Sequence, residues 1–211
     1  MLNGGIRVGM LTDVFGASGS GKTQLCFQLC VNCTKSINKQ GLDASVLFID
    51  TTNTFRPERI IGMAKCYGIN NEILDKIYFH KVYNVTDQMT VLKKIPMLEN
   101  LKLVIIDNIS DLFSFEYTQS LSAEKHMKLM RLMHELALYA INCDVAIVIT
   151  NNVRFDGYEN KEYLGRSIAT FTHVKIELEK DKNVFKAKLL QPILKPRSEF
   201  FQISEKGITD V

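Results

Sequence analysis

The chain has 211 residues, of which 46% are hydrophobic and 23% are charged, and its formal net charge is +3. These values predict a single globular domain over residues 1–211 and exclude a disordered or collagen-like chain. No apolar run is long enough to span a bilayer, and the N-terminus lacks the hydrophobic stretch of a signal peptide, so we expect a cytoplasmic protein without membrane contact. The small positive charge permits nucleic-acid binding without arguing for it.

The first expected elements are a strand over residues 10–15 and a helix over residues 22–38. The segment between them fits G-x-x-x-x-G-K-[ST], a loop whose backbone amides curl around phosphate oxygens. In this pattern the lysine reaches the β- and γ-phosphates of a nucleotide, and the hydroxyl of the last residue binds Mg²⁺. We therefore predict that the following residues bind a nucleotide: Gly16, Ala17, Ser18, Gly19, Ser20, Gly21, Lys22, Thr23 and Gln24.

Three cysteines, Cys26, Cys30 and Cys33, lie in the helix that follows this loop. Their C-x3-C-x2-C spacing can ligate an iron–sulfur cluster, but it is also the i, i+4, i+7 spacing of one helix face. We favour core packing, because cluster ligands generally come from loops, and keep an iron–sulfur enzyme as a remote alternative. We also expect Cys66 and Cys143 to be core residues and all thiols to be reduced.

The middle of the chain alternates strands with helices. We expect strands over residues 45–50, 77–82 and 103–107, with helices over residues 57–67 and 86–98 between them. The last of these strands is almost continuously apolar, as in a parallel strand that is buried on both faces, and it ends in Asp107. A carboxylate in that place, downstream of a phosphate-binding loop, can hold Mg²⁺ against the β- and γ-phosphates, so we predict a metal-binding and catalytic role for Asp107.

A loop over residues 109–122 is expected to precede a long helix over residues 123–141. Met127, Met130 and Met133 recur near one face of this helix. Methionines at helical spacing can form an adaptable binding surface, but they more often lie in the core, and we predict the core.

The C-terminal third is expected to contain mainly strands. After a buried strand over residues 145–150 we predict a polar loop over 151–164, a hairpin of 173–179 with 184–190, and a last strand over 199–203. The whole order predicts an α/β fold with a mostly parallel sheet, flanking helices and C-terminal antiparallel strands.

Four segments, in this order along the chain, resemble one known family. They are FGASGSGKTQLCFQL at 15–29, FIDTTNTFRPERI at 48–60, AIVITNNV at 146–153 and FQISEKGITD at 201–210. They are similar to the ATPase core of RecA-type recombinases, above all the archaeal RadA and RadB proteins. The resemblance implies a RecA-like P-loop NTPase core, ATP and Mg²⁺ bound between subunits of a homo-oligomer, DNA binding, and a role in recombinational repair.

The resemblance also implies roles for three residues outside the phosphate-binding loop. The family has an adenine-stacking arginine where this chain has Arg59, a γ-phosphate-sensing glutamine where it has Asn152, and a catalytic glutamate where it has Thr52. Threonine cannot act as a carboxylate base, and such a base contributes on the order of 10²–10⁴ in rate. We therefore expect Lys22-dependent ATP binding with slow turnover, unless an acid such as Asp50, Glu58 or one from a neighbouring subunit compensates.

The family's two DNA-binding loops differ in this chain. The first is arginine-rich in the family, whereas residues 118–126 contain no arginine, which predicts weaker and less salt-sensitive DNA binding. In the second loop, Tyr158 and Tyr163 are candidates to stack on bases. Three cations in the same loop are candidate contacts to DNA phosphates: Arg154, Lys161 and Arg166.

The sequence begins at the ATPase core, without the N-terminal domain and linker strand of RadA, and in this it resembles RadB. We expect a RadB-like paralog that binds ATP and, weakly, single-stranded DNA, and that assists a full-length RadA-type recombinase. One alternative is an active DNA-dependent ATPase that exchanges strands, against which Thr52 weighs. Another is a KaiC-like ATP-binding regulator, against which salt-dependent binding to single-stranded DNA would weigh.

Overall fold

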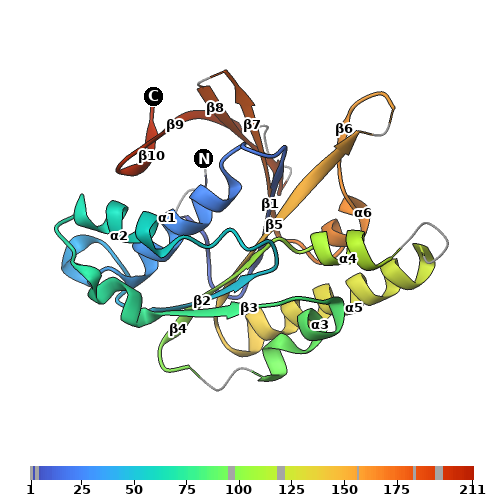
Figure 1. The fold of residues 1–211 in the computed structure, drawn as a ribbon, viewed down its shortest axis with the longest axis horizontal. Helices are drawn as coiled ribbons and strands as arrows, with labels where there is room; N and C mark the ends of the chain where they lie inside the picture. The colour runs from blue at the N-terminus through green and yellow to red at the C-terminus, as the bar shows by residue number, and fades with distance from the viewer. Residues whose placement is uncertain are drawn as a thin grey trace.

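The computed structural model describes residues 2, 5–94, 98–117, 122–155, 157–182, 184–192 and 197–211. Strands and helices alternate through the first half of the chain (Figure 1). The elements of this half are β1 (Leu11–Gly16), α1 (Lys22–Thr34), η1 (Ile37–Lys39), β2 (Ser45–Asp50), α2 (Pro57–Lys65), η2 (Asn71–Lys76), β3 (Ile77–Lys81), α3 (Val85–Lys94) and β4 (Leu101–Asp107). The second half contains α4 (Asp111–Glu116), α5 (Ser122–Asn142), β5 (Ala146–Phe155), β6 (Asn160–Glu162), α6 (Gly165–Ala169), β7 (Val174–Asp181), β8 (Val184–Gln191), β9 (Arg197–Ser204) and β10 (Gly207–Asp210).

The strands form a mixed sheet in the order β10-β9-β8-β7-β1-β5-β4-β2-β3, and β6 pairs with β5 outside this path. From β7 to β3 neighbouring strands are parallel, whereas β8, β9 and β10 are antiparallel. Every residue of β1 and β2 is buried, as expected for parallel strands that are covered on both faces. The predicted α/β fold, with a mostly parallel sheet and C-terminal antiparallel strands, is confirmed.

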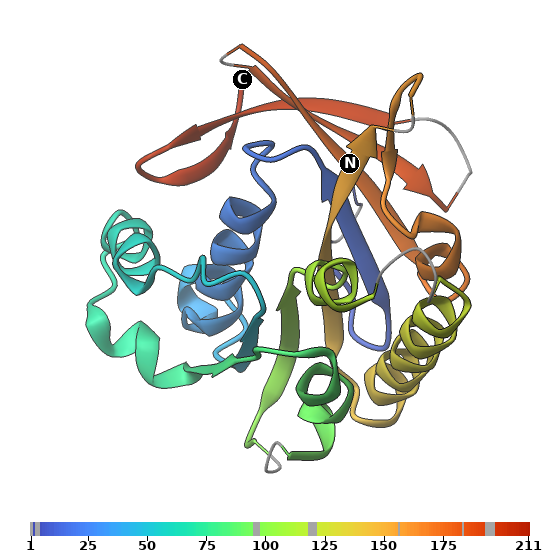
Figure 2. The ribbon, with the colours of Figure 1, turned by 45° about the vertical axis from the view of Figure 1, so that its right-hand side comes forward.

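Helices cover both faces of the sheet (Figure 2). α1 and α2 lie on one face beneath the curved end formed by β8, β9 and β10, and α3, α4 and α5 lie on the other. Each face has its own hydrophobic core, with Phe48 in the first and Phe113 in the second, both fully buried. Burying one such ring is worth about 1.5–3 kcal/mol. Within the described residues, no helix is both long enough and apolar enough to span a membrane.

The cysteines divide into a buried and an exposed group. Cys26, Cys30 and Cys33 are buried in the first core, which confirms core packing. Burial raises the pKa of the Cys33 thiol to about 11 and raises those of the other two as well, so all three remain protonated. The prediction that Cys66 and Cys143 are core residues is wrong, because each follows the last residue of a helix at the surface, where both are exposed.

The expected methionine stripe on α5 is also wrong for Met127 and Met130, which are exposed, while Met133 is buried. The buried face of this helix is formed instead by Leu129, Leu132 and Leu136, which recur at i, i+3 and i+7. Because each residue of a helix advances by about 100°, choosing the leucines as the inner face turns two of the methionines outward.

Two segments that we expected to be loops contain regular structure. Residues 109–122 include α4, which begins with a buried Ser110 at its N-cap position. Residues 151–164 continue β5 and pair it with β6, forming the β5–β6 hairpin that projects from the body of the molecule (Figure 1). Polar sequence misled the prediction there, since a two-stranded ribbon outside the core tolerates polar side chains on both faces.

Candidate functional site

The loop between β1 and α1 forms a cradle at the carboxyl end of a central strand. A Cβ atom on Gly16 would lie 2.2 Å from the Leu178 carbonyl oxygen, so only glycine fits there. Gly21, at the N-cap of α1, has a φ of 98° and offers no side-chain cap to the helix. The first-turn amides of α1 therefore lack a side-chain acceptor from their own cap, which is the arrangement of a helix N-terminus that binds an anion.

The ammonium group of Lys22 folds back onto this loop and binds its carbonyl oxygens. Its Nζ donates hydrogen bonds to the carbonyl oxygens of Gly16, at 2.8 Å, and Ala17, at 3.0 Å, and the side chain is only 9% exposed. Burial lowers the pKa of Lys22, while the negative charges of Asp107 and Asp111 act in the opposite direction. The lysine thus provides a positive charge beside the amides of the cradle.

Asp107, at the end of β4, lies beside the threonine hydroxyl of the predicted phosphate-binding loop. Thr23 Oγ1 donates to Asp107 Oδ2 at 2.7 Å, Thr54 donates to the same oxygen at 3.3 Å, and Thr150 donates to the other oxygen. Burial raises the pKa of Asp107, the Asp50 charge adds to this, and the three hydroxyl donors oppose it. A buried carboxylate oxygen next to a threonine hydroxyl is a donor pair that suits Mg²⁺.

The cradle opens into a cavity of about 370 Å³, which lies at the carboxyl ends of the parallel strands. Ligands of open α/β sheets bind at this edge. The lining residues are Ser18, Gly19, Gly21, Lys22, Thr23, Gln24, Thr52, Thr54, Asp107, Asn108, Asp111 and Asn152. The fold therefore brings together nine of the residues expected at the site from four separate segments of the chain. Sequence reasoning missed Asp111, whose only signal was an acid four residues after Asp107.

Arg59 lies outside this cavity. Its Nε donates to Gln24 Oε1 at 2.9 Å, and its two terminal nitrogens donate to the carbonyl oxygens of Ser204 and Glu205. The guanidinium group therefore joins α2 to the turn between β9 and β10. Of its partners, Gln24 lines the cavity.

Thr52, which we expected to stand in place of a catalytic glutamate, places a short hydroxyl side chain at the cavity. Thr52 Oγ1 lies 2.8 Å from Thr54 Oγ1, and the backbone amide of Thr52 donates to Asp50 Oδ1 at 2.9 Å. The second oxygen of Asp50 accepts the amide of Phe55 at 3.0 Å. Both oxygens of this buried carboxylate thus bind backbone, and Asp50 does not line the cavity.

Three alternate residues of β5 attach this strand to β4 and α4. Because side chains alternate along a strand, Thr150, Asn152 and Arg154 share one face. Asn152 Nδ2 donates to Asp111 Oδ1 at 3.0 Å. The other two bonds are Thr150 to Asp107 and Arg154 to Ser114.

The candidate DNA-binding cations lie on and after the β5–β6 hairpin. The guanidinium of Arg154 stacks 4.0 Å above the ring of Tyr163, whose hydroxyl accepts Lys125 at 3.0 Å. Arg154 therefore covers one face of the Tyr163 ring, so a nucleobase cannot stack on that face. Lys161 pairs with Glu159 at 3.2 Å, and Arg166 is exposed on α6.

The remaining candidates for DNA contact differ in exposure. Tyr158 is 94% exposed beyond the end of β5. Of the first-loop segment 118–126, residues 118–121 lie outside the described residues, and the rest forms the first turn of α5.

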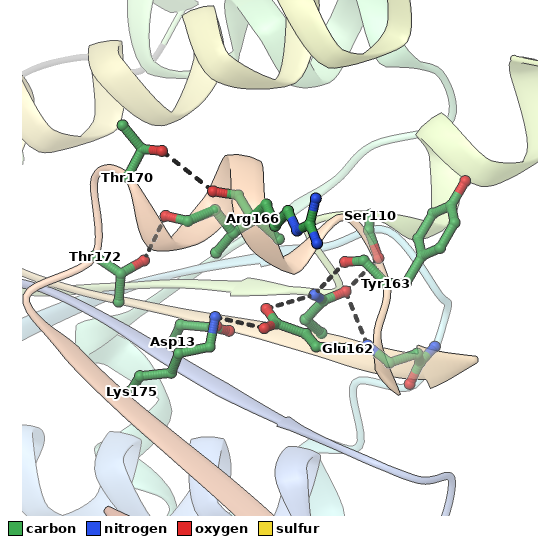
Figure 3. Close-up of polar contacts among 11 residues, drawn as sticks. Asp13, Ser110, Glu162, Tyr163, Arg166, Thr170, Thr172 and Lys175 are labelled. Atoms are coloured by element: carbon green, nitrogen blue, oxygen red, sulfur yellow. Dashed lines mark hydrogen bonds and ion pairs between the residues drawn. The ribbon is translucent and has the colours of Figure 1, made fainter. Parts of the chain in front are cut away.

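A buried triad of charged residues, which sequence reasoning missed, connects the hairpin to the sheet (Figure 3). It consists of Asp13 on β1, Glu162 on β6 and Lys175 on β7. Lys175 pairs with Glu162 and lies 3.3 Å from Asp13 Oδ2, although neither oxygen of Asp13 accepts a hydrogen bond from the described residues. The sequence offered one sign of this triad, since Asp13 lies inside the mainly apolar segment of residues 11–16.

The triad continues toward the cavity through Asn151. Its Nδ2 donates to Glu162 Oε1 at 3.0 Å and to the carbonyl oxygen of Tyr163 at 2.8 Å. Its Oδ1 accepts the backbone amide of Asn152 at 2.9 Å and the hydroxyl of Ser110. Asn151 therefore fixes the backbone on both strands of the hairpin next to the cavity.

Two ionised carboxylates and one ammonium would leave one excess negative charge in the triad, which favours a proton on Asp13, the most deeply buried of the three. Burial raises the pKa of Asp13 well above its usual value, and Glu162 raises it further. The folded protein then keeps a proton that the unfolded chain releases above about pH 4. The contribution of Asp13 to stability is thus complete below that pH and is lost as the pH rises toward the folded-state pKa.

We therefore expect Asp13→Asn to gain stability relative to the wild type as the pH is raised from about 4 to 8, because asparagine cannot ionise. Thermal unfolding measured across this pH range checks the prediction. In a protein of this size, each kcal/mol of change in the free energy of unfolding shifts Tm by about 2–4 °C. Asp75→Asn, at an exposed position, is the control and should follow the wild type. A difference between Asp13→Asn and wild type that does not change with pH would contradict the protonated state of Asp13.

Comparison with known proteins agrees with this geometry. The chain matches the Rad51 family model over residues 1–211. It is 35% identical, over 222 aligned positions, to the protein named DNA repair and recombination protein RadA from Cenarchaeum symbiosum (strain A). That alignment covers 100% of this chain and 56% of the relative, so the chain spans about half the length of the curated relative that it matches. The chain belongs to the Rad51 family and contains the ATPase core of the RecA/RadA-type recombinases.

Proposed function

We propose that this protein is an ATP- and DNA-binding recombinase paralog, similar to RadB, that assists homologous recombination and DNA repair and hydrolyses ATP slowly. One observation carries the proposal. The cavity combines a phosphate-binding loop and Asp107 with Thr52, a hydroxyl side chain, at the position of the family's catalytic glutamate. We further propose that residues 1–211 act as one RecA-like domain beside a full-length RadA-type recombinase.

The nucleotide in this proposal is ATP with Mg²⁺. The loop amides and Lys22 would hold the phosphates, and Thr23 with Asp107 would hold the metal ion. Bound Mg²⁺ supplies charge neutralisation at the β- and γ-phosphates. Slow turnover leaves ATP as a conformational switch, since the γ-phosphate then persists long enough to favour one state of the protein.

The β5–β6 hairpin is the proposed DNA-binding element. It carries Arg154 and Lys161, precedes Arg166, and projects from the body of the molecule (Figure 1). The name of the curated relative, DNA repair and recombination protein RadA, supports a role in DNA repair and recombination. With few cations available, binding to single-stranded DNA should be weak and salt-dependent.

Measuring single-stranded DNA binding by fluorescence anisotropy over a range of salt concentrations tests this proposal. Arg166→Gln is expected to weaken binding and to lower the slope of log K against log salt by about 0.7, the value for one lost phosphate contact. Lys65→Gln removes an equal charge at the end of α2, far from the hairpin, and should leave the slope unchanged.

Two outcomes would redirect the proposal. If the wild-type protein binds no single-stranded DNA at low salt but binds ATP, the KaiC-like regulator becomes the better interpretation. If ATP turnover is fast and rises with DNA, the protein is an active DNA-dependent ATPase, and the accessory role is wrong.

A further inference from the structure

The absence of a glutamate at position 52 raises the question of which group activates water in the slow hydrolysis proposed above. We infer that Asp111, the first residue of α4, is a catalytic residue that accepts the proton of the attacking water. This inference rests on the proposed ATP hydrolysis and adds the residue through which it proceeds.

Few side chains that line the cavity could accept a proton from the attacking water. Among the described residues that line it, the only carboxylates are Asp107 and Asp111. Asp107 accepts hydrogen bonds from three threonine hydroxyls and lies beside Thr23, the donor set that suits the metal ion. A carboxylate engaged with a cation is a poor proton acceptor, so Asp111 is the acid that remains.

The two acids of this chain that we expected to compensate for Thr52, Asp50 and Glu58, do not line the cavity. Both oxygens of Asp50 accept backbone amides, and the residue is 1% exposed. Glu58 lies in the first turn of α2, is exposed, and does not line the cavity. Neither carboxylate therefore faces the space in which the phosphates and the attacking water are proposed to lie.

Asp111 is held in an orientation suited to the task. Its Oδ1 accepts the side-chain amide of Asn152 at 3.0 Å, and its second oxygen has no hydrogen-bond partner among the described residues. The carboxylate is half-buried, and its charge acts on Lys22 across the cavity. A base that a third group holds through one oxygen, while the other oxygen has no protein partner, is a recurrent catalytic arrangement.

The proposed step is a hydrolysis. The oxygen of water forms a bond to the γ-phosphorus of ATP while the bond from that phosphorus to the β,γ-bridging oxygen breaks. Asp111 takes one proton from the water and passes it on to solvent or phosphate, and the electron pair of the broken bond leaves on ADP. The products are ADP and inorganic phosphate, and no further reactant is required.

A double-mutant cycle tests the assignment. Single-turnover ATP hydrolysis would be measured for wild type, Asp111→Asn, Thr52→Glu and the double variant. The rate of Lys22→Ala, which should not hold the phosphates, gives the residual rate to be subtracted. Asp111→Asn should lower the wild-type rate by at least about tenfold, whereas Asp111→Glu retains a measurable rate. In the Thr52→Glu background the same substitution should cost less than about threefold, because a glutamate then supplies the base.

Binding of fluorescent ATP and ADP analogues provides a readout that does not depend on turnover. Asparagine keeps an oxygen for the Asn152 amide, so Asp111→Asn should bind ATP at least as tightly as the wild type. An equal loss of rate in both backgrounds, or weaker ATP binding, would show a structural role and overturn the inference. A wild-type rate equal to the Lys22→Ala background would overturn the proposed hydrolysis, whereas an unchanged rate in Asp111→Asn would overturn only the role of Asp111.

Discussion

Replacing Lys22 by alanine is expected to lower the affinity for Mg·ATP about 100-fold, because it removes a charge-assisted contact to two phosphates worth about 3 kcal/mol. The side chain is nearly buried and bonded to two loop carbonyls, so its ammonium is fixed at the mouth of the cradle. Titration with a fluorescent ATP analogue measures the loss. Thermal unfolding with and without Mg·ATP checks it independently, since a ligand stabilises only a protein that binds it.

The control for this substitution is Lys65→Ala, which removes an exposed lysine from the end of α2. It should bind ATP as the wild type does. Equal affinities of wild type and Lys22→Ala would mean that the phosphates do not bind in the cradle. The assignment of the cavity would then be wrong.

Thr52→Glu is expected to raise ATP turnover by on the order of 10², the lower part of the range for general-base assistance. Thr52 is half-buried at the cavity, and within the described residues its hydroxyl forms hydrogen bonds only with Asp50 and Thr54, so a longer side chain can extend into the open space. Steady-state phosphate release with Mg²⁺, with and without single-stranded DNA, measures the gain.

Thr52→Gln is the matched variant, because it has the length of glutamate without the ability to accept a proton. It should remain at the wild-type rate. If Thr52→Glu binds ATP normally but gains no activity, the lost glutamate is not what limits turnover, and the chain is slow for another reason.

The meeting of the predicted nucleotide-binding residues at one cavity could be expected from the sequence, because these residues belong to local patterns in a fixed order. The glycines in the loop of residues 16–23 determine its backbone conformation. Asp107 follows an almost entirely apolar strand, which is the pattern of a central strand that is buried on both faces. Parallel strands end at the same edge of a sheet, so the two had to meet. The position of the Arg59 side chain could not be predicted from a local pattern, because it bonds to carbonyl groups some 145 residues further along the chain.

The rest of the site depends on contacts that no local pattern reveals. Asp13, Glu162 and Lys175 come from three separate strands, so no single stretch of sequence shows that the three side chains meet. The β5–β6 hairpin has a polar sequence because it lies outside the two cores, and hydrophobic periodicity carries no signal there. Exposure at helix ends, as at Cys66 and Cys143, likewise depends on where a helix stops against its neighbours.

The attachment of β5 to β4 and α4 has a mechanical consequence. The three bonds lie in a row along one face of a single strand whose far end is the hairpin. A pull on the hairpin along the strand axis loads all three in shear at once, whereas a pull across the axis would peel them one after another. If the hairpin binds DNA as proposed, tension from the bound strand would pass through these three bonds to the cavity. Its effect would then depend on the direction of the pull as well as on its strength.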